Sequence, residues 1–301
     1  MMDRRMVLSS AVGATATLLI GGRGLAEAQP TPGGKPAPSA SKAARARVNG
    51  IDLYYETHGS GAPLVLLHGG IGEIDMFGPV LPALAAGRQV IAVDLQGHGG
   101  TADIARPLSY EAMADDVAAL VHHLGLSNAS VLGYSLGGGV ALRTAIQHPQ
   151  VVRRLVIVST PFKRAGWHRE NLDGMAQTTS AVAESLKQTP LWELYSKKAP
   201  RPQDFPRLLD KMASFLSRDY DWSAEVAALR QPTMVVSGDW DAVRIDHTAE
   251  LFKLLGGGQK DALWDGSNMN LNRLTILPGA THYTIFSDPR LAAAAIPFLD
   301  A

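Results

Sequence analysis

The stretch "ASVLGYSLGGGVAL", residues 129–142, joins an apolar run to a helical pattern through one serine set between glycines. Within it, Gly133-Tyr134-Ser135-Leu136-Gly137 fits the pattern G-x-S-x-G, with a strand-like run before it and a helix-like run after it. A strand-to-helix turn this tight leaves no room for a side chain on either flank, which explains the glycines. The stretch therefore predicts a sharply turned serine, held at the carboxyl end of a sheet.

Short apolar runs alternate with helical patterns along the rest of the chain. The runs "PLVLLHGG", "QVIAVDLQGHG", "ASVLGYS", "RLVIVST", "PTMVVSGD" and "NRLTILPG" are typical of strands buried on both faces, as in a parallel sheet. One helical pattern between them starts at Ser109 and ends at Gly125, and Asn49-Gly50 predicts a hairpin turn. The sequence thus predicts an α/β fold, with a mostly parallel central sheet and helices on both faces.

One interval breaks this alternation. Residues 162–230 contain several helical patterns and no strand-like run, which predicts a helical insertion. It is either a cap over the carboxyl edge of the sheet or a set of ordinary scaffold helices. Three tryptophans, Trp167, Trp192 and Trp222, lie in it and suit a pocket roof or the packing of the insertion on the core. We expect the folded domain to cover residues 45–301.

The N-terminus is typical of an export signal. Paired arginines, Arg4 and Arg5, precede a moderately apolar run, and Ala26-Glu27-Ala28 has the small-x-small form of a cleavage site, so residues 1–28 resemble a bacterial twin-arginine signal. A membrane anchor is the alternative, but the run is short and diluted by Ser, Thr and Gly. Residues 29–44, rich in Pro, Gly, Ala and Ser, predict a disordered linker. We expect a periplasmic or secreted protein, without stable membrane association after cleavage.

Composition excludes several kinds of chemistry. Twenty-eight basic residues balance twenty-eight acidic ones, so no net field favours nucleic acid or an anionic membrane surface. The 301-residue chain has no cysteine, which rules out disulfides, thiolate nucleophiles, Fe–S clusters and cysteine-ligated zinc. Any catalysis must use other groups.

A serine nucleophile needs a base and an acid behind it in the chain. The expected order is Ser, then Asp or Glu after a later strand, then His after the last strand. "MVVSGDWDAV" offers Asp239 and Asp241, and "LTILPGATHYTIF" offers His282. Of nine histidines, only His282 follows the last predicted strand. A structural role is expected for His68, His98, His122 and His123.

From about residue 45 to its end, the chain resembles α/β-hydrolases of the esterase and cofactor-free haloperoxidase-like type. The resemblance is carried by "LVLLHGG", "VIAVDLQGHGGT", "SVLGYSLGGGVAL", "HPQVVRRLVIVST", "VVSGDWDAV" and "LPGATHY". It implies Ser135 as nucleophile, His282 as general base and Asp241 as the acid that orients the imidazole. Asp241 is preferred to Asp239 because the second acid of similar G-D-x-D patterns usually points at the histidine. Asp265, in the insertion "GGGQKDALWDGSNMN", is a further rival.

The resemblance also implies an oxyanion hole and a reaction. The hole would consist of the main-chain N–H groups of Leu136 and Gly70, with Ile71 as the alternative to Gly70. The expected reaction is hydrolysis of a small to medium, mostly uncharged ester or lactone through an acyl-enzyme, with no metal or organic cofactor. Alternatives are C–C bond hydrolysis of a ring-cleavage diketone and a ligand receptor with little turnover. Relatives that open epoxides or remove halogens use a carboxylate where this chain has Ser135, which disfavours those reactions.

Overall fold

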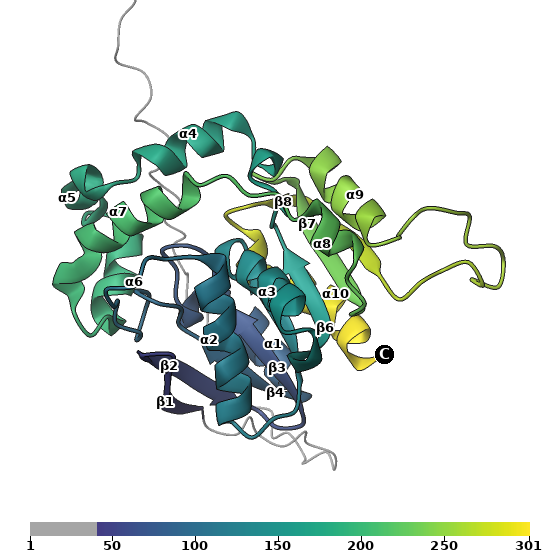
Figure 1. Ribbon diagram of the computed structural model, residues 1–301, viewed down its shortest axis with the longest axis horizontal. Coiled ribbons are helices and arrows are strands. Elements are labelled where there is room, and N and C mark those ends of the chain that lie inside the picture. Colours follow the sequence, from purple (N-terminus) through teal and green to yellow (C-terminus); the bar gives the residue numbers. More distant parts are fainter. Residues whose placement is uncertain (1–40) are drawn as a thin grey trace, which may run out of the picture. The chain divides into compact units, whose positions relative to one another are not determined.

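A single sheet forms the centre of the protein (Figure 1). A computed structural model describes residues 41–301, and within them eight strands follow the spatial order β1-β2-β4-β3-β5-β6-β7-β8. β2 pairs antiparallel with β1 and β4, whereas the other neighbouring strands pair in parallel, which confirms the predicted α/β class. The strands are β1 (Lys42–Val48), β2 (Ile51–His58), β3 (Ala62–Leu67), β4 (Arg88–Val93), β5 (Ala129–Tyr134), β6 (Val152–Val158), β7 (Thr233–Trp240) and β8 (Arg273–Thr281).

Alternate side chains of the parallel strands enter two apolar cores, one on each face of the sheet. In β3, Leu64 and Leu66 join one core, Val65 and Leu67 join the other, and all four are fully buried. A strand in this position needs an apolar residue at every site, which explains the uninterrupted runs in the sequence. The core that contains Val65 also receives side chains from helices α2 (Tyr110–His123), α3 (Leu136–Gln147) and α9 (Ile245–Leu254). The core that contains Leu64 receives side chains from α1 (Val80–Ala85) and α10 (Pro289–Asp300).

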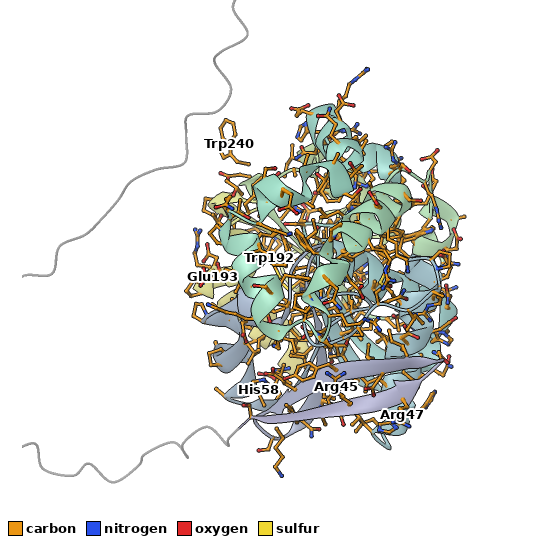
Figure 2. The ribbon with its side chains drawn as sticks, turned by 90° about the vertical axis from the view of Figure 1, so that its left-hand side faces the viewer. Arg45, Arg47, His58, Trp192, Glu193 and Trp240 are labelled. Atoms are coloured by element: carbon orange, nitrogen blue, oxygen red, sulfur yellow. The ribbon has the colours of Figure 1, made fainter. Side chains whose placement is uncertain are left out.

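The predicted hairpin is confirmed between β1 and β2. Asn49 and Gly50 form its turn with φ angles of +47° and +78°, the left-handed region that an Asn-Gly pair tolerates. Figure 2 shows Arg45 and Arg47 on this hairpin. Likewise, Ser109 caps α2 as predicted, since its hydroxyl accepts a hydrogen bond from the Ala112 N–H at 3.1 Å.

The predicted linker boundary needs a correction. β1 begins at Lys42, inside the segment 29–44 that the composition predicts to be disordered. Residues 42–44 belong to the sheet because they pair with residues 55–57 of β2. Such pairing uses main-chain groups and needs no apolar side chains, so composition does not reveal it. The predicted export signal, residues 1–28, and the rest of the predicted linker up to residue 40 lie outside the described residues.

The interval 162–230 is helical, as predicted, and we call it the cap. Residues of α4, α6 and α7 line a cavity that also includes Ser135, so the cap covers the carboxyl end of β5. Trp192 and Trp222 pack against aromatic rings, whereas Trp167 lines the cavity. The cap helices are α4 (Arg169–Gln177), α5 (Ala183–Leu186), α6 (Pro190–Lys198), α7 (Phe205–Leu216) and α8 (Ser223–Ala227). Short 3-10 helices are η1 (Ile74–Phe77), η2 (Pro149–Val151), η3 (Arg164–Gly166), η4 (Ser180–Val182), η5 (Pro202–Asp204) and η6 (Ile285–Ser287).

The segment 256–272 projects from the body between α9 and β8 (Figure 1). Trp264 of this segment is fully exposed, and Trp240, at the end of β7, also points outward (Figure 2). None of the helices within residues 41–301 combines the length and apolarity needed to cross a bilayer.

Lys198, at the end of α6, ties the cap to three carboxylates of the body. Its Nζ lies 3.0 Å from Glu56 Oε1, 3.0 Å from Glu73 Oε2 and 3.8 Å from Asp94 Oδ2. Glu73 and Asp94 are almost fully buried, so this lysine supplies the countercharge that their burial requires. The polar contact fixes α6 above the sheet.

The acid cluster makes the stability of the protein depend on pH. Burial raises the pKa of Asp94 to about 7, although Lys198 and the Gly100 N–H act to lower it. Between the ordinary pKa of a carboxyl group and pH 7, the native state therefore keeps a proton that the unfolded state has released. Because the native state binds more protons there, the contribution of Asp94 to stability falls as pH rises through this window.

Replacing Lys198 by methionine should destabilise the protein most at high pH. Lys198→Met leaves buried carboxylates without a cation, and we expect a loss of about 3–5 kcal/mol in the free energy of unfolding at pH 8. The loss should be smaller at pH 5, where Asp94 is protonated. Urea unfolding followed by tryptophan fluorescence at both pH values measures it.

The adjacent lysine provides a matched control. Lys197 is exposed and pairs with Glu193 one turn earlier in the same helix, so Lys197→Met should leave the urea midpoint unchanged. A loss in Lys198→Met that is equal at pH 5 and pH 8 would contradict the role given to the buried acids.

Candidate active site

Ser135 lies in the sharp turn between β5 and α3. Its backbone has φ +53° and ψ −115°, a conformation that non-glycine residues rarely adopt. A Cβ at Gly133 would lie 2.1 Å from the Gly137 carbonyl oxygen, and one at Gly137 would lie 2.4 Å from the Leu67 carbonyl oxygen. The steric reason that the sequence suggested for both glycines is confirmed.

Three side chains at three strand ends form one hydrogen-bonded series. His282 directly follows β8, and its Nε2 lies 3.1 Å from Ser135 Oγ. Its Nδ1 lies 2.9 Å from Oδ1 of Asp241, which directly follows β7. An ionised carboxylate only accepts hydrogen bonds, so Nδ1 carries the imidazole proton and Nε2 is left to accept from the Ser135 hydroxyl. Such an arrangement can take a proton from a serine that attacks an electrophile.

Asp241 is buried and held by donors on both of its oxygens. Oδ1 accepts from His282 Nδ1 and from the Val243 N–H at 3.0 Å, and Oδ2 accepts from the Ser159 hydroxyl and from the Gly238 N–H at 3.2 Å. Burial alone would raise the pKa of Asp241, but the hydrogen bond and charge of His282, with the bonds from Ser159 and Val243, outweigh it and lower that pKa. The carboxylate is therefore ionised opposite the imidazole.

The two rival acids have other partners. The exposed Asp239 accepts a hydrogen bond from the Gly279 N–H at 2.7 Å. Asp265 lies in the projecting segment 256–272 and accepts from the Ser267 N–H at 3.0 Å. Of the three acids that the sequence offered, Asp241 is the one that the fold brings to His282.

His68 shapes the loop that follows β3. Its Nε2 accepts a hydrogen bond from the Leu95 N–H at 3.0 Å, and its Nδ1 donates to the Gly69 carbonyl at 2.7 Å. Burial lowers the pKa of His68 to about 3, so the ring is neutral and can make both bonds. His98 is buried in the same region, and burial lowers its pKa to about 4. The hydrogen bonds of His68 and the burial of His98 fit the structural roles predicted for these two histidines. His122 and His123 are exposed on α2.

The N–H groups proposed for an oxyanion hole belong to two neighbouring segments, since a Cβ at Gly70 would lie 4.0 Å from the Cβ of Leu136. Leu136 is the first residue of α3, and the N–H groups in the first turn of a helix have no partner within it. The loop after β3 turns through a hydrogen bond from the Gly72 N–H to the Gly69 carbonyl, at 3.1 Å. Gly70 and Ile71 stand between these two residues, and both line the cavity. The loop therefore offers two candidate donors in the cavity that Leu136 also lines.

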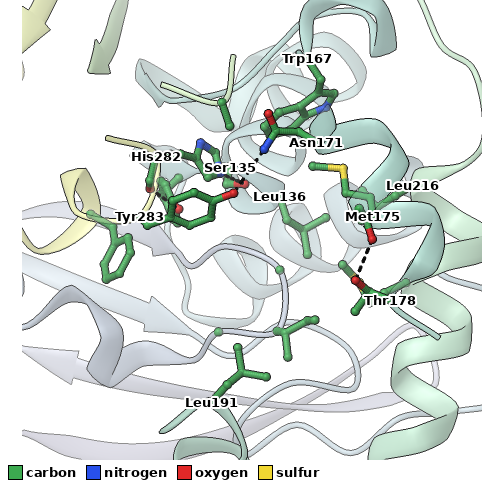
Figure 3. A pocket seen from close by; sticks show the side chains of 18 of the residues that line it. Ser135, Leu136, Trp167, Asn171, Met175, Thr178, Leu191, Leu216, His282 and Tyr283 are labelled. Carbon is green, nitrogen blue, oxygen red and sulfur yellow. Dashed lines mark hydrogen bonds between the residues drawn. The ribbon is translucent and has the colours of Figure 1, made fainter. Parts of the chain in front are cut away.

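A cavity of about 770 Å³ opens beside Ser135, between the cap and the body (Figure 3). Among its described lining residues, Glu170 is the one carboxylate and there is no lysine or arginine. At one side, Asn171 of α4 donates a hydrogen bond to the hydroxyl of Tyr283, which follows His282, at 3.2 Å (Figure 3). The apolar wall consists mainly of Ile71, Met76, Tyr110, Tyr134, Leu136, Trp167, Met175, Leu191, Leu194, Met212, Leu216 and Phe286.

Sequence reasoning missed two polar contacts of the series. Tyr134 donates its hydroxyl hydrogen bond to the His282 carbonyl oxygen at 2.6 Å, and so holds the loop that carries the imidazole. Ser159 donates to Asp241. Tyr134 could have been noticed as the variable residue of G-x-S-x-G, but Ser159 belongs to no motif.

Comparisons with known proteins identify the family of this chain. A family model for the alpha/beta hydrolase fold matches residues 62–286. The chain belongs to the α/β-hydrolase family. The "Putative carbamate hydrolase" of Azorhizobium caulinodans is 30% identical over 228 residues, covering 70% of this chain and 84% of that protein.

Two further α/β-hydrolase relatives extend the comparison. The "Putative esterase/lipase" of Haemophilus influenzae is 26% identical over 224 residues, or 74% of each protein. The crystal structure of a hydrolase from Pseudomonas aeruginosa has a TM-score of 0.63 and 25% identity, covering 86% of this chain and 98% of that one. The protein is thus a member of a hydrolase family that includes relatives named as esterases. Within residues 41–301 of this α/β-hydrolase, no group of three or more His, Asp or Glu side chains could hold a metal ion.

A methyl group in the turn between β5 and α3 of this α/β-hydrolase should disturb the packing that holds Ser135 in place. In Gly133→Ala, the added Cβ meets main-chain atoms of α3 that cannot move independently. We expect the free energy of unfolding to fall by about 1–3 kcal/mol, as for other overpacked interiors. Urea unfolding measures the change.

Gly87→Ala is the control, because a Cβ there would meet no atom within 4 Å and its φ is not in the left-handed region. Its effect should be a small stabilisation, about 0.4–1 kcal/mol at most, through the unfolded chain. Equal stability of Gly133→Ala and the wild type would mean that β5 and α3 are not fixed against each other.

Proposed function

We propose that the protein hydrolyses carboxylic esters, lactones included, with Ser135 as the nucleophile and a covalent acyl-enzyme as the intermediate. The observation that carries the proposal is the series from Ser135 through His282 to Asp241, at the side of an apolar cavity. A relative named "Putative esterase/lipase" supports the same class of reaction.

The first half-reaction forms the acyl-enzyme. As Ser135 Oγ attacks the ester carbonyl carbon, its proton passes to His282 Nε2, and Asp241 stabilises the resulting imidazolium. The carbonyl oxygen becomes an oxyanion, which the Leu136 N–H and a second N–H from Gly70 or Ile71 would bind. The C–O bond to the alcohol then breaks, and His282 gives its proton to the leaving oxygen.

The second half-reaction returns the free enzyme. Water attacks the acyl carbon, His282 takes one of its protons, and the same N–H groups bind the new oxyanion. Collapse of this intermediate releases the carboxylic acid and restores the Ser135 hydroxyl. The net change is one ester and one water converted to one acid and one alcohol, and each proton is handled by the single imidazole.

The cavity favours an uncharged, apolar acyl group. Methionine, leucine and aromatic side chains form most of its wall, and a chain of methylene groups gains free energy by leaving water for such a surface. Glu170 is exposed at this cavity, where its charge opposes an anionic group. We therefore propose small to medium neutral esters as substrates.

Three substitutions test the nucleophile, the base and the acid. The rate of p-nitrophenyl butyrate hydrolysis should fall by about 10³-fold or more in Ser135→Ala, His282→Ala and Asp241→Asn. Each substitution removes one of three groups, the nucleophile, the base or the acid, that act together. Asp239→Asn is the matched control and should keep wild-type activity, since Asp239 bonds to Gly279 instead.

Other outcomes would favour another reaction. Full activity in His282→Ala or Asp241→Asn would refute the assigned roles. A single burst followed by a stall, with tight binding of the product, would favour a ligand receptor. Turnover of a ring-cleavage diketone with no turnover of any ester would favour C–C bond hydrolysis.

A terminal charge on the acyl chain should slow the reaction. The p-nitrophenyl esters of hexanoic acid and of adipic acid have six-carbon chains, but the second ends in a carboxylate that must leave water. We expect kcat/KM for the adipate monoester to be about 100-fold lower than kcat/KM for the hexanoate ester. This corresponds to a difference of about 2.7 kcal/mol in activation free energy. Glu170→Gln should raise kcat/KM for the adipate monoester about two- to fivefold and leave kcat/KM for the hexanoate ester unchanged. Equal rates for the two esters would contradict the proposed preference.

A further inference from the structure

Strained backbone gathers around Ser135. Five non-glycine residues in the described part of the chain have positive φ angles, which carry a steric cost for any residue with a Cβ. Asn49 belongs to the hairpin turn and Leu263 to the projecting segment, where such angles are ordinary. The other three, Ile71, Ser135 and Ser159, follow β3, β5 and β6 at the carboxyl edge of the sheet. The proposed mechanism gives a role to the loop of Ile71 and to Ser135, but none to Ser159.

Ser159 is held between two strands that carry the site. It directly follows β6, its φ is +52°, and it is about 1% exposed. Its N–H donates to the carbonyl of Val236 in β7 at 2.9 Å, which fixes its main chain. Its hydroxyl donates to Oδ2 of Asp241, the carboxylate oxygen that does not face His282. The side chains of Ser159 and His282 therefore donate hydrogen bonds to different oxygens of the Asp241 carboxylate.

The strain at Ser159 needs a reason, because glycine would adopt the same φ without steric cost. The one feature that serine adds over glycine here is its hydroxymethyl group, and that hydroxyl contacts Asp241. A hydrogen bond to a charged group is stronger than one between neutral groups, and it also restricts rotation of the carboxylate. The gain at Asp241 is thus a physical reason for a strained serine at this position.

We propose that Ser159 is a positioning residue, whose hydroxyl orients the Asp241 carboxylate toward His282 and so supports proton transfer from Ser135. This inference rests on the proposed function, since it assigns to Ser159 an effect on the base that activates Ser135. The hydroxyl contacts neither substrate nor reacting atoms in this role. It acts through Asp241.

Several ionisable groups surround the carboxylate and bear on any pH profile. His282 bonds to it directly, and the buried Tyr134 hydroxyl is close enough for its pKa to be raised by the charge on Asp241, after the larger effect of burial. Asp241 also borders a second cleft. The ionisable groups that line this cleft are His168, Glu170, Asp239, Arg244, Asp246 and Tyr283.

Substitution by glycine separates the structural from the positioning role. Ser159→Gly removes the hydroxyl and relieves the strain. These two changes act on stability in opposite directions, so we expect a thermal midpoint close to that of the wild type, with kcat about tenfold lower and KM within about twofold. Ser159→Ala keeps the strain and loses the hydroxyl, and it should show the same fall in kcat. A residue that only supported the fold would make kcat follow stability.

Substitution by threonine keeps the hydroxyl and increases the backbone strain, the reverse of the glycine variant. Ser159→Thr retains the hydroxyl but places a β-branched side chain at a positive φ, so its thermal midpoint should fall while kcat of the folded enzyme stays within about threefold of the wild type. Ser130→Ala is the matched control, because Ser130 is also buried but lies at the amino end of β5. Its kcat should be unchanged. If Ser159→Thr does not fold, the glycine and alanine variants still decide the question.

Two further measurements report on the carboxylate itself. The acid limb of the kcat/KM profile should move to higher pH in Ser159→Gly, by up to about one unit, because a carboxylate with one donor fewer attracts the proton on the base it faces more strongly. The NMR signal of the proton on His282 Nδ1 should shift in Ser159→Gly and Ser159→Ala, but not in Ser130→Ala. This signal needs no substrate.

The result that overturns the inference differs from the one that overturns the proposed function. Wild-type kcat, pH profile and Nδ1 proton signal in Ser159→Gly and Ser159→Ala, in an enzyme that Ser135→Ala inactivates, would remove the role of Ser159 and leave ester hydrolysis intact. Unchanged ester hydrolysis in Ser135→Ala would refute the proposed function. In that case, the Nδ1 proton signal would still report whether Ser159 positions Asp241.

Discussion

Parallel strands that are buried on both faces end at the same edge of their sheet, and this constraint decides where polar chemistry can lie in the protein. Ser135, Ser159, Asp241 and His282 directly follow β5, β6, β7 and β8, which are consecutive neighbours in the sheet. Residues 147 positions apart in the chain thereby come within hydrogen-bonding distance. The apolar packing that fixes the strands also fixes the separations between these four side chains.

The same constraint explains how much the sequence could predict. Continuous apolar runs locate the strands, and the polar residues just after each run are then placed at the common edge. Ser135 and His282 can be selected in this way without coordinates. The preference for Asp241 over Asp239 came only from the resemblance, because both acids stand where β7 ends and the local bend of the chain decides which one turns inward. Asp239 accepts a hydrogen bond from the Gly279 N–H, while Asp241 accepts one from His282.

What the sequence could not reveal is mostly polar and distant in the chain. Tyr134 meets the His282 carbonyl across 148 positions, Ser159 meets Asp241 across 82, and Lys198 meets Glu73 across 125. Periodicity reports which face of an element is buried, but it carries no signal for one particular pair of polar groups. The start of β1 was missed for a related reason, since main-chain pairing leaves little trace in side-chain composition.

Two of the polar contacts between the cap and the body differ greatly in strength. At α6, Lys198 is embedded among buried carboxylates, whereas at α4 the link to the loop after His282 is one hydrogen bond between Asn171 and the exposed Tyr283. Local opening begins where the free energy of separation is smallest. Of these two contacts, we therefore expect the one between Asn171 and Tyr283, beside His282, to open before the one between Lys198 and the buried acids.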